Sequence, residues 1–123
     1  MPVFLLNAVI ETIKYIISGG RKSMQKIHVK ANRHWMNDPN GFIYYKGKYH
    51  LFYQCFPYEA RWGRMHWAHV VSDDLVNWEY QGIAVFPSKT DDRDGCFSGS
   101  AVEDEGKLYL YYTGVRYLVE NPE

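Results

Sequence analysis

Hydrophobic residues follow two different periods along this chain of 123 residues. Near the N-terminus they recur every three or four positions, which is the spacing of one face of an α-helix. The apolar positions of this face are Leu6, Val9, Ile10, Ile13, Ile16 and Ile17. Gly19 and Gly20 follow them and are typical of a helix end. The pattern predicts a short amphipathic helix in residues 1–23, before a differently organised region of residues 24–123.

The segment of residues 1–23 does not have the features of a targeting signal. A secretory signal has basic residues before its apolar part, whereas Arg21 and Lys22 come after it. The apolar part is also shorter than the about 20 residues that span a membrane. A second interpretation is that Gly19-Gly20-Arg21 is encoded by a purine-rich ribosome-binding sequence and that translation starts at Met24. Residues 1–23 would then be a spurious extension, and the codons would show it.

The remaining chain contains short runs of aromatic and β-branched residues that follow glycine-containing turns, a pattern typical of β-hairpins. Gly47–Gln54 and Gly106–Thr113 are similar runs that start 59 residues apart (106 minus 47). A repeat of this length predicts β-propeller blades, and propellers close with roughly four to eight blades. The expected fold class is therefore all-β, with about two blades of a propeller in this chain.

The segment Trp35-Met36-Asn37-Asp38-Pro39-Asn40-Gly41 places a carboxylate where the backbone is constrained. Pro39 disfavours the α conformation at Asp38, and Asn40-Gly41 predicts a turn. The segment resembles the N-terminal signature of glycoside hydrolase family 32, which includes invertases, fructanases and sucrose-6-phosphate hydrolases. In that family its aspartate is the catalytic nucleophile, so the resemblance implies this role for Asp38. It also implies a five-bladed propeller, which would need roughly 300 residues at this period.

Further motifs extend the resemblance from about residue 27 to about residue 117, in the order that the family has them. They are Tyr53-Gln54-Cys55-Phe56-Pro57, Trp62-Gly63, residues 65–69, residues 72–78 and Phe97-Ser98-Gly99-Ser100. In the family, the glutamine, the tryptophan and the Phe-Ser pair line the fructose pocket. The substrate-binding residues implied by the resemblance, together with two residues of the first motif, are Trp35, Asn37, Gln54, Trp62, Phe97 and Ser98.

Two catalytic blocks of the family have no counterpart in these residues. In the family, an Arg-Asp-Pro block stabilises the transition state and a Glu-Cys block supplies the acid/base, and both follow the Phe-Ser-Gly-Ser block. Arg93-Asp94 does not match, because Gly95 replaces the proline and the pair precedes Phe97. The chain is therefore expected to be an N-terminal fragment that is inactive alone. The rest of the propeller and a C-terminal β-sandwich would be missing from it.

Composition and charge exclude one class of function. Lys plus Arg and Asp plus Glu both number 14, so no excess of positive charge indicates binding to nucleic acid or to an anionic membrane. Aromatic residues make up 17% of the chain, which suits strand packing as well as sugar-binding platforms. Most of these aromatic side chains are expected to pack the blades.

Cysteine and histidine residues give no indication of a metal or cofactor, and none is expected. Cys55 and Cys96 form neither a disulfide framework nor a metal-binding motif, so they predict inert free thiols and a cytoplasmic location. His66 and His69 lie three positions apart in an apolar run that is typical of a strand. A strand would place them on opposite faces, where they cannot share a metal ion.

Two acidic segments are interpreted as structural. Ser72-Asp73-Asp74 predicts a turn whose side chains bond nearby backbone amides, with Trp78 anchoring the next strand. Residues 91–94 predict a solvated loop, in which Asp94 is the candidate for the pocket rim.

The predicted function is hydrolysis of the β-fructofuranosyl bond of sucrose or sucrose 6-phosphate by a retaining double displacement. Residues 94–114 resemble the sucrose-6-phosphate hydrolases most, and Arg61 and Arg64 are candidates for contacting a phosphate or for plain surface residues. Sucrose, sucrose 6-phosphate and fructan stay open as substrates. The alternatives are a non-catalytic sugar-binding fragment, a truncated pseudogene product, and a propeller glycosidase acting on arabinan or xylan. The complete motif at residues 35–41 disfavours the last of these.

Overall fold

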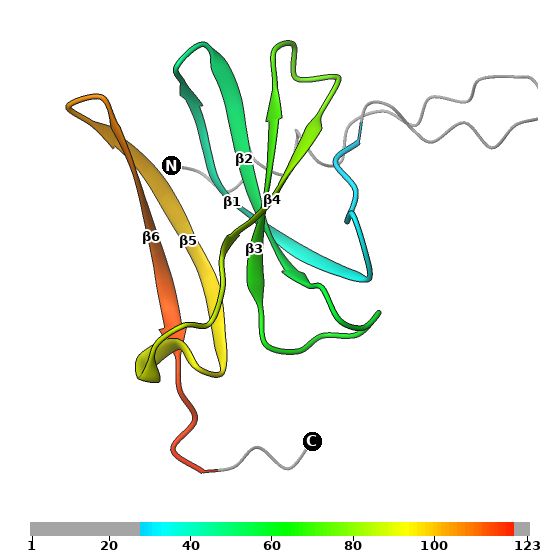
Figure 1. Cartoon of the computed structure of the whole chain (residues 1–123), viewed down its shortest axis with the longest axis vertical. Helices are drawn as coiled ribbons and strands as arrows, with labels where there is room; N and C mark the ends of the chain where they lie inside the picture. Colours follow the sequence, from blue (N-terminus) through cyan, green and yellow to red (C-terminus); the bar gives the residue numbers. More distant parts are fainter. Residues whose placement is uncertain (1–27, 120–123) are drawn as a thin grey trace, which may run out of the picture.

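The computed structural model describes residues 28–119, which form an all-β fold with one short 3₁₀-helix (Figure 1). The elements are β1 (Trp35–Tyr45), β2 (Lys48–Phe56), β3 (His66–Ser72), β4 (Glu79–Val85), η1 (Thr90–Asp92), β5 (Gly95–Asp104) and β6 (Lys107–Val115). The all-β prediction is confirmed. The helix expected in residues 1–23 lies outside the described residues. No helix in residues 28–119 is long and apolar enough to cross a membrane.

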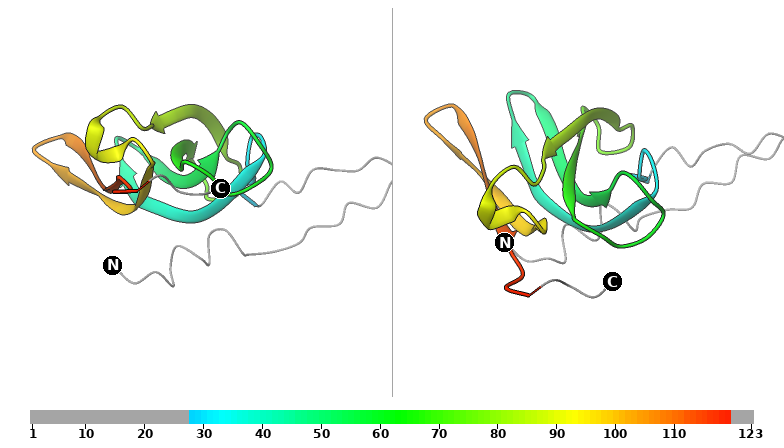
Figure 2. Two further views of the ribbon diagram at one scale, coloured as in Figure 1. Left: turned by 90° about the horizontal axis from the view of Figure 1, so that it is seen from below. Right: turned by 60° about the horizontal axis from the view of Figure 1, so that its bottom comes forward.

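The strands form two antiparallel sheets. One has four strands in the order β1-β2-β3-β4, and the other consists of β5 and β6. Figures 1 and 2 show the two sheets side by side, and β5 contacts β1, so the first strand of each sheet lies at their common boundary. This is the arrangement of neighbouring propeller blades: one blade of four strands and the first two strands of the next.

The predicted internal repeat is confirmed in the two hairpin turns. Lys46-Gly47 joins β1 to β2 with φ angles of 47° and 82°, and Glu105-Gly106 joins β5 to β6 with 48° and 74°. Two consecutive positive φ angles are the mark of a type I′ turn, whose twist matches that of the flanking strands. The turns lie 59 residues apart (105 minus 46), the same offset as the sequence repeat.

The first strand of each sheet is interrupted by an irregularity. The pairing of β1 with β2 shifts between Met36 and Pro39, and that of β5 with β6 shifts between Phe97 and Gly99. A β-bulge leaves its extra residues out of the ladder and redirects their side chains, and bulges are frequent beside active sites. The residues released in this way are Asn37 and Asp38 on β1 and Ser98 on β5.

The turn predicted at Asn40-Gly41 is wrong, because β1 continues through both residues. Gly41 does have a positive φ of 53°, but it accommodates a second register shift within the strand. A Cβ atom there would lie 3.0 Å from the ring of Phe52 and 3.2 Å from Cβ of Ala101, so close packing also favours glycine. Pro39 is tolerated because β1 is the edge strand of its sheet.

The alternating faces of β2 supply two hydrophobic clusters. The first contains Val29, Leu51, Tyr53, Cys55, Ala68 and Val70, with Trp78 packed against it. The second contains Phe52, Trp67 and Cys96, with Leu108, Leu110 and Tyr112 packed against it, and so joins the two sheets. Burial raises the pKa of Cys55 to about 11 and that of Cys96 to about 12, so both thiols are protonated at neutral pH. The prediction of buried free thiols is confirmed.

The two acidic segments differ from each other in burial. The turn after β3 forms as predicted, since the Ser72 hydroxyl accepts hydrogen bonds from the backbone N–H groups of Asp74 and Leu75. The prediction of a solvated loop at residues 91–94 is wrong for Asp92, which is only 2% exposed. Its carboxylate accepts hydrogen bonds from the backbone of Ser88 and Lys89 and from the hydroxyl of Tyr112. The acidic run predicted exposure because the donors that allow Asp92 to be buried cannot be recognised from the sequence.

Candidate active site

Asp38 and Ser98 face each other across the boundary between the two sheets. Asp38 is exposed and lies in the β1 irregularity, while Ser98 lies in the β5 irregularity. The Ser98 hydroxyl donates a hydrogen bond of 2.7 Å to Oδ2 of Asp38. Two distortions of the ladder, 60 residues apart in sequence, thus direct a hydroxyl and a carboxylate toward the same point.

A chain of hydrogen bonds connects Asp38 to three more of the residues singled out from the sequence. The indole Nε1 of Trp35 donates to Oδ1 of Asn37 at 3.0 Å, and the Asn37 amide donates to Oε1 of Gln54. Nε2 of Gln54 donates to Oγ of Ser98 at 3.1 Å, and Ser98 donates to Asp38. The structure therefore joins Trp35, Asn37, Gln54, Ser98 and Asp38 in one network, which fixes the direction of the Ser98 hydroxyl proton.

Gln54 differs from the other members of the network in its burial, with only 3% of its surface exposed. It lies on β2 next to the start of β1, because Met36 pairs with Cys55. The two ends of its amide are used by Asn37 and Ser98. Gln54 is therefore placed to hold the side chains of Asn37 and Ser98 in position, and it has little surface left for contact with a ligand.

The two remaining candidates, Trp62 and Phe97, contact each other. Trp62 lies in the loop between β2 and β3 and is 37% exposed, and Phe97 precedes Ser98 on β5. Their rings meet edge to face with centroids 5.8 Å apart, a favourable geometry for aromatic pairs. The pair therefore forms an apolar wall that starts one residue from Ser98.

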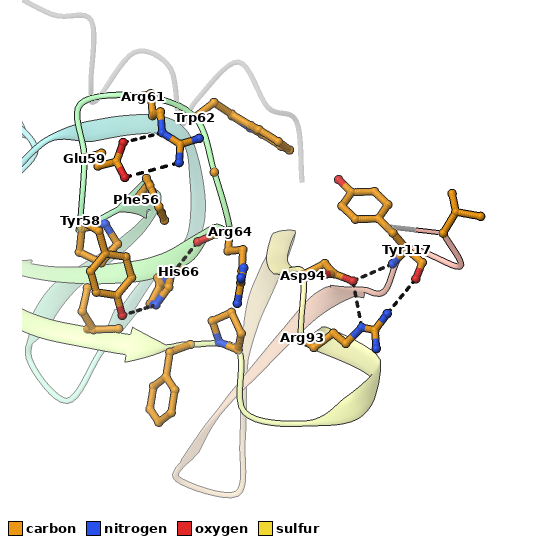
Figure 3. A pocket seen from close by; sticks show the side chains of 16 residues that line it. Phe56, Tyr58, Glu59, Arg61, Trp62, Arg64, His66, Arg93, Asp94 and Tyr117 are labelled. Atoms are coloured by element: carbon orange, nitrogen blue, oxygen red, sulfur yellow. Dashed lines mark hydrogen bonds and ion pairs between the residues drawn. The ribbon is translucent and has the colours of Figure 1, made fainter. Parts of the chain in front are cut away.

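A cavity of about 980 Å³ opens beside this wall, between the β2–β3 loop and the segments that precede β5 and follow β6 (Figure 3). Trp62 and Asp94 line it, but Asp38 does not. Figure 3 shows two ion pairs within it, Arg61 with Glu59 at 2.6 Å and Arg93 with Asp94 at 3.2 Å. Asp94 also accepts a 2.8 Å hydrogen bond from the backbone N–H of Tyr117. The cavity is thus a neighbour of the Asp38 network, because Trp62 lines it and contacts Phe97, the residue before Ser98.

The two histidines of β3, His66 and His69, contact different residues. Nδ1 of His66 lies 2.8 Å from the carbonyl oxygen of Arg64, and burial lowers the pKa of this histidine. Nε2 of His69 lies 3.0 Å from Nδ1 of His50. The prediction that His66 and His69 face different ways is confirmed. Within residues 28–119, no three His, Cys, Asp or Glu side chains are grouped so that they could hold a metal ion.

Asn40 was missed among the site residues because Asn-Gly was interpreted as a turn. It is only 1% exposed. Its Nδ2 donates to the carbonyl oxygen of Asp38 at 3.1 Å, and its Oδ1 accepts from the backbone N–H of Gly99 at 3.2 Å. Asn40 and Gly99 are separated by 59 residues, the repeat length, so this asparagine joins equivalent points of the two sheets. The repeat was the one sequence signal that could have connected them.

Comparison with known proteins agrees with this geometry. The family model described as the glycosyl hydrolases family 32 N-terminal domain matches residues 28–122, most of the chain. The chain belongs to glycoside hydrolase family 32. The recognition made from the motifs at residues 35–41 and downstream is therefore confirmed.

Members of family 32 match the chain in sequence and in structure. A sucrose-6-phosphate hydrolase of Zymomonas mobilis is 56% identical over 87 residues, which are 71% of this chain and 17% of that protein. The crystal structure of fructan 1-exohydrolase IIa from Cichorium intybus superposes with a TM-score of 0.67 at 44% identity, covering 71% of this chain and 17% of the plant protein. A sucrose-6-phosphate hydrolase from Lactobacillus gasseri superposes with a TM-score of 0.63 at 52% identity, covering 64% of this chain and 16% of the bacterial protein. The chain thus spans less than a fifth of the length of these relatives.

Proposed function

We propose that this chain forms the N-terminal part of a β-fructofuranosidase in which Asp38 is the nucleophile. The observation that carries the proposal is the exposed Asp38 carboxylate, oriented by the 2.7 Å hydrogen bond from Ser98 and backed by Gln54, Asn37 and Trp35. Such a network holds the attacking group in one direction before the substrate arrives, and preorganisation of this kind lowers the barrier to reaction. The sequence motifs and the family of the chain support the same role.

The reaction is a retaining double displacement. Because Ser98 bonds Oδ2 of Asp38, we assign Oδ1 as the oxygen that attacks the anomeric carbon of the fructosyl unit. The bond from that carbon to the leaving sugar breaks, and its electron pair stays on the departing oxygen, which an acid protonates. Water then attacks the anomeric carbon and gives a proton to the same acid/base group, and the bond from that carbon to Asp38 breaks so that Asp38 leaves as a carboxylate. The acid/base group must lie about 5–5.5 Å from Asp38 and is assigned to the part of the enzyme that follows this chain.

The residues around Asp38 suit a sugar with several hydroxyl groups. Asn37 presents an amide beside the nucleophile, while Trp35, Trp62 and Phe97 offer apolar surfaces on which the CH groups of a sugar can pack. We assign sucrose or sucrose 6-phosphate as the substrate, because sucrose-6-phosphate hydrolases are among the relatives with the highest identity. We also place the enzyme in the cytoplasm, where the free thiols of Cys55 and Cys96 stay reduced.

A chimera tests the proposal, with residues 28–119 replacing the matching segment of the Lactobacillus gasseri sucrose-6-phosphate hydrolase. The host then supplies the acid/base and the remaining blades. We expect the chimera to hydrolyse sucrose 6-phosphate or sucrose and to release fructose with retained anomeric configuration. NMR spectra recorded during the reaction measure that configuration. A folded chimera that binds sugar but releases no fructose would favour the non-catalytic alternative.

Within the chimera, Asp38→Asn is the decisive variant, because it keeps the shape of the side chain and removes the nucleophile. We expect kcat to fall by about three orders of magnitude or more, since an amide cannot replace the carboxylate. Asp73→Asn is the matched control, because Asp73 is an exposed carboxylate whose ion pair with Lys48 lies on the surface. Retention of more than roughly a tenth of kcat in Asp38→Asn, a cost of only about 1.4 kcal/mol, would remove Asp38 from this role.

A further inference from the structure

We infer that Asn40 is a positioning residue that holds Asp38 against Ser98 across the boundary of the two blades. The part of the inference that concerns catalysis rests on the proposed function. The two hydrogen bonds of the Asn40 side chain, called the clamp below, are a property of the fold. Asn40 touches the backbone of Asp38 on its own strand and the backbone of Gly99, the residue after Ser98, on the other sheet. One buried amide therefore connects the two irregularities that present the carboxylate and the hydroxyl.

Because Asn40 is buried, its two hydrogen bonds are important for the stability of this part of the fold. With 1% of its surface exposed, the side chain cannot exchange its partners freely for water. A buried amide without partners is destabilising, so the fold favours keeping both contacts. The amide also has a defined direction, because its NH₂ group donates to the Asp38 carbonyl and its oxygen accepts from Gly99.

The β5 side of the clamp is a fixed reference point. A Cβ atom at Gly99 would lie 1.9 Å from the carbonyl oxygen of Tyr111, so β5 packs against β6 here more closely than any side chain allows. The neighbouring carbonyl groups are also held, since Trp67 donates to the Phe97 oxygen and Thr113 donates to the Ser98 oxygen, both at 3.1 Å. Asn40 therefore ties the Asp38 segment to this braced part of β5.

This arrangement predicts that loss of the Asn40 amide changes the position of Asp38 without removing any group that reacts. Misplacement of a reacting group by about 1 Å can lower the rate by about 100-fold. The effect should appear in kcat and much less in KM, because the groups that contact the sugar remain. A residue with only a structural role would lower the melting temperature while each folded molecule kept its turnover.

The chain offers a matched control in Tyr45, whose hydroxyl donates a 2.7 Å hydrogen bond to the carbonyl oxygen of Gly106. This bond joins the same two sheets, but at the hairpin end of β1, away from Asp38. Tyr45→Phe therefore removes one hydrogen bond between the blades and leaves the clamp intact. Comparing it with Asn40→Ala separates positioning of Asp38 from general adhesion of the blades.

Kinetics of the chimera test the catalytic part of the inference. We expect Asn40→Ala to lower kcat per folded molecule by about 30–100-fold with KM changed by less than about threefold, and Tyr45→Phe to change kcat by less than about twofold. In a Ser98→Ala background, the further loss from Asn40→Ala should shrink to less than about fivefold, because both residues act on the same geometry. An undiminished loss in that background, or an equal loss of kcat in Tyr45→Phe, would overturn the inference. Asn40→Ser, which keeps a small polar group, replaces Asn40→Ala if the latter does not fold.

Hydrogen exchange of the Gly99 amide tests the clamp independently of activity. In the chimera, this amide should exchange at least about tenfold faster in Asn40→Ala or Asn40→Ser than in the parent or in Tyr45→Phe. Unchanged exchange in the Asn40 variants would overturn the clamp even if kcat fell. If the parent chimera hydrolyses no fructoside but the exchange result is as expected, the proposed function fails and the clamp stands.

Discussion

Two tryptophans of this chain occupy different environments, although both belong to motifs of the family. Trp62 is 37% exposed in the β2–β3 loop and touches Phe97 edge to face. Trp78 is half-buried against the first hydrophobic cluster, and its indole nitrogen donates to the carbonyl oxygen of Leu75 at 3.2 Å. The family resemblance, which implied a pocket role for Trp62, and the turn predicted before Trp78 had already indicated this division.

Replacement of each tryptophan by alanine should therefore have a different consequence in the chimera. Trp62→Ala should lower kcat/KM while the melting temperature changes little, because an exposed ring contributes mainly to binding. Trp78→Ala should destabilise the protein by about 3 kcal/mol, near the lower limit for loss of a packed aromatic ring. Thermal unfolding and sucrose 6-phosphate kinetics check both variants. A stability loss at Trp62 as large as that at Trp78 would make Trp62 a core residue.

Single residues could be predicted from the sequence where a motif identified them, and could not where burial decided their role. The motifs identify all five members of the Asp38 network, but they do not show which of them are joined by hydrogen bonds. Asn40 and Asp92 were missed because polar residues next to glycine or in an acidic run suggest exposure. Both are buried because donors and acceptors from distant strands surround them, and such partners are not visible in a local pattern.

At the scale of elements, the loop between β4 and β5 depends on one carboxylate. Burial acts to raise the pKa of Asp92, but hydrogen bonds from Lys89, Tyr112 and Ser88 outweigh it and lower the pKa. The same contact raises the pKa of Tyr112 to about 12. Asp92 thus fastens this loop to β6 just before β5 begins and so supports the position of Ser98.

Asp92→Ala should destabilise the fold by about 1–3 kcal/mol, because it leaves the Tyr112 hydroxyl and the backbone N–H groups of Ser88 and Lys89 without the acceptor of their part-buried hydrogen bonds. Asp91→Ala is the matched neighbour, since Asp91 is exposed and only 3.6 Å from Arg116 in a surface ion pair. We expect Asp91→Ala to change stability by less than about 0.5 kcal/mol. Urea unfolding of the chimera with each variant measures the free energy of unfolding. An equal loss of stability in Asp92→Ala and Asp91→Ala would mean that Asp92 does not hold the loop.

Hairpins were easier to predict than the irregularities within their strands. A type I′ turn depends on two consecutive residues, so Lys46-Gly47 and Glu105-Gly106 were recognisable from sequence. The register shifts at residues 37–38 and at residue 98 depend on how β1 and β5 fit against each other and against their partner strands. A local pattern does not contain that information, and the Asn-Gly pair in β1 was consequently assigned to a turn.

At the scale of the whole molecule, a histidine pair lies beside the cluster that joins the two sheets. His69 stacks on Phe52 at 4.4 Å and lies next to His50. Burial, followed by the charge of His50, lowers the pKa of His69 to about 4 from its ordinary value of 6.5. The unfolded chain therefore binds protons more readily, and stability should fall as the pH decreases from about 6.5 to about 4.

His69→Gln should weaken this pH dependence, because it removes one of the groups that must take up a proton on unfolding. The free energy of unfolding of the parent chimera should drop between pH 7 and pH 5 by on the order of 1 kcal/mol more than that of the variant, after allowance for partial exposure. Urea titrations at the two pH values measure it. Equal pH dependence in parent and variant would show that His69 does not contribute.

The second sheet has an open edge among the described residues, since β6 pairs with β5 on one side only. Tyr109 and Tyr111 are exposed on this strand, and an open apolar edge favours association between copies. The 123-residue chain expressed alone should therefore self-associate and release no fructose from sucrose. Sedimentation at several concentrations and a reducing-sugar assay check this, and a monomer that hydrolyses sucrose would contradict it.

Asp38, as the proposed nucleophile, should form a covalent bond to the fructosyl unit, and trapping that bond is the most direct test of its role. The chimera, with the acid/base glutamate of its host replaced, is mixed with β-fructofuranosyl fluoride, whose leaving group needs no acid, and is quenched and mapped by peptide mass spectrometry. We expect one added fructosyl unit on the peptide that contains Asp38 and none in the Asp38→Asn variant. A fructosyl unit on a different carboxylate, or turnover without any covalent adduct, would contradict it.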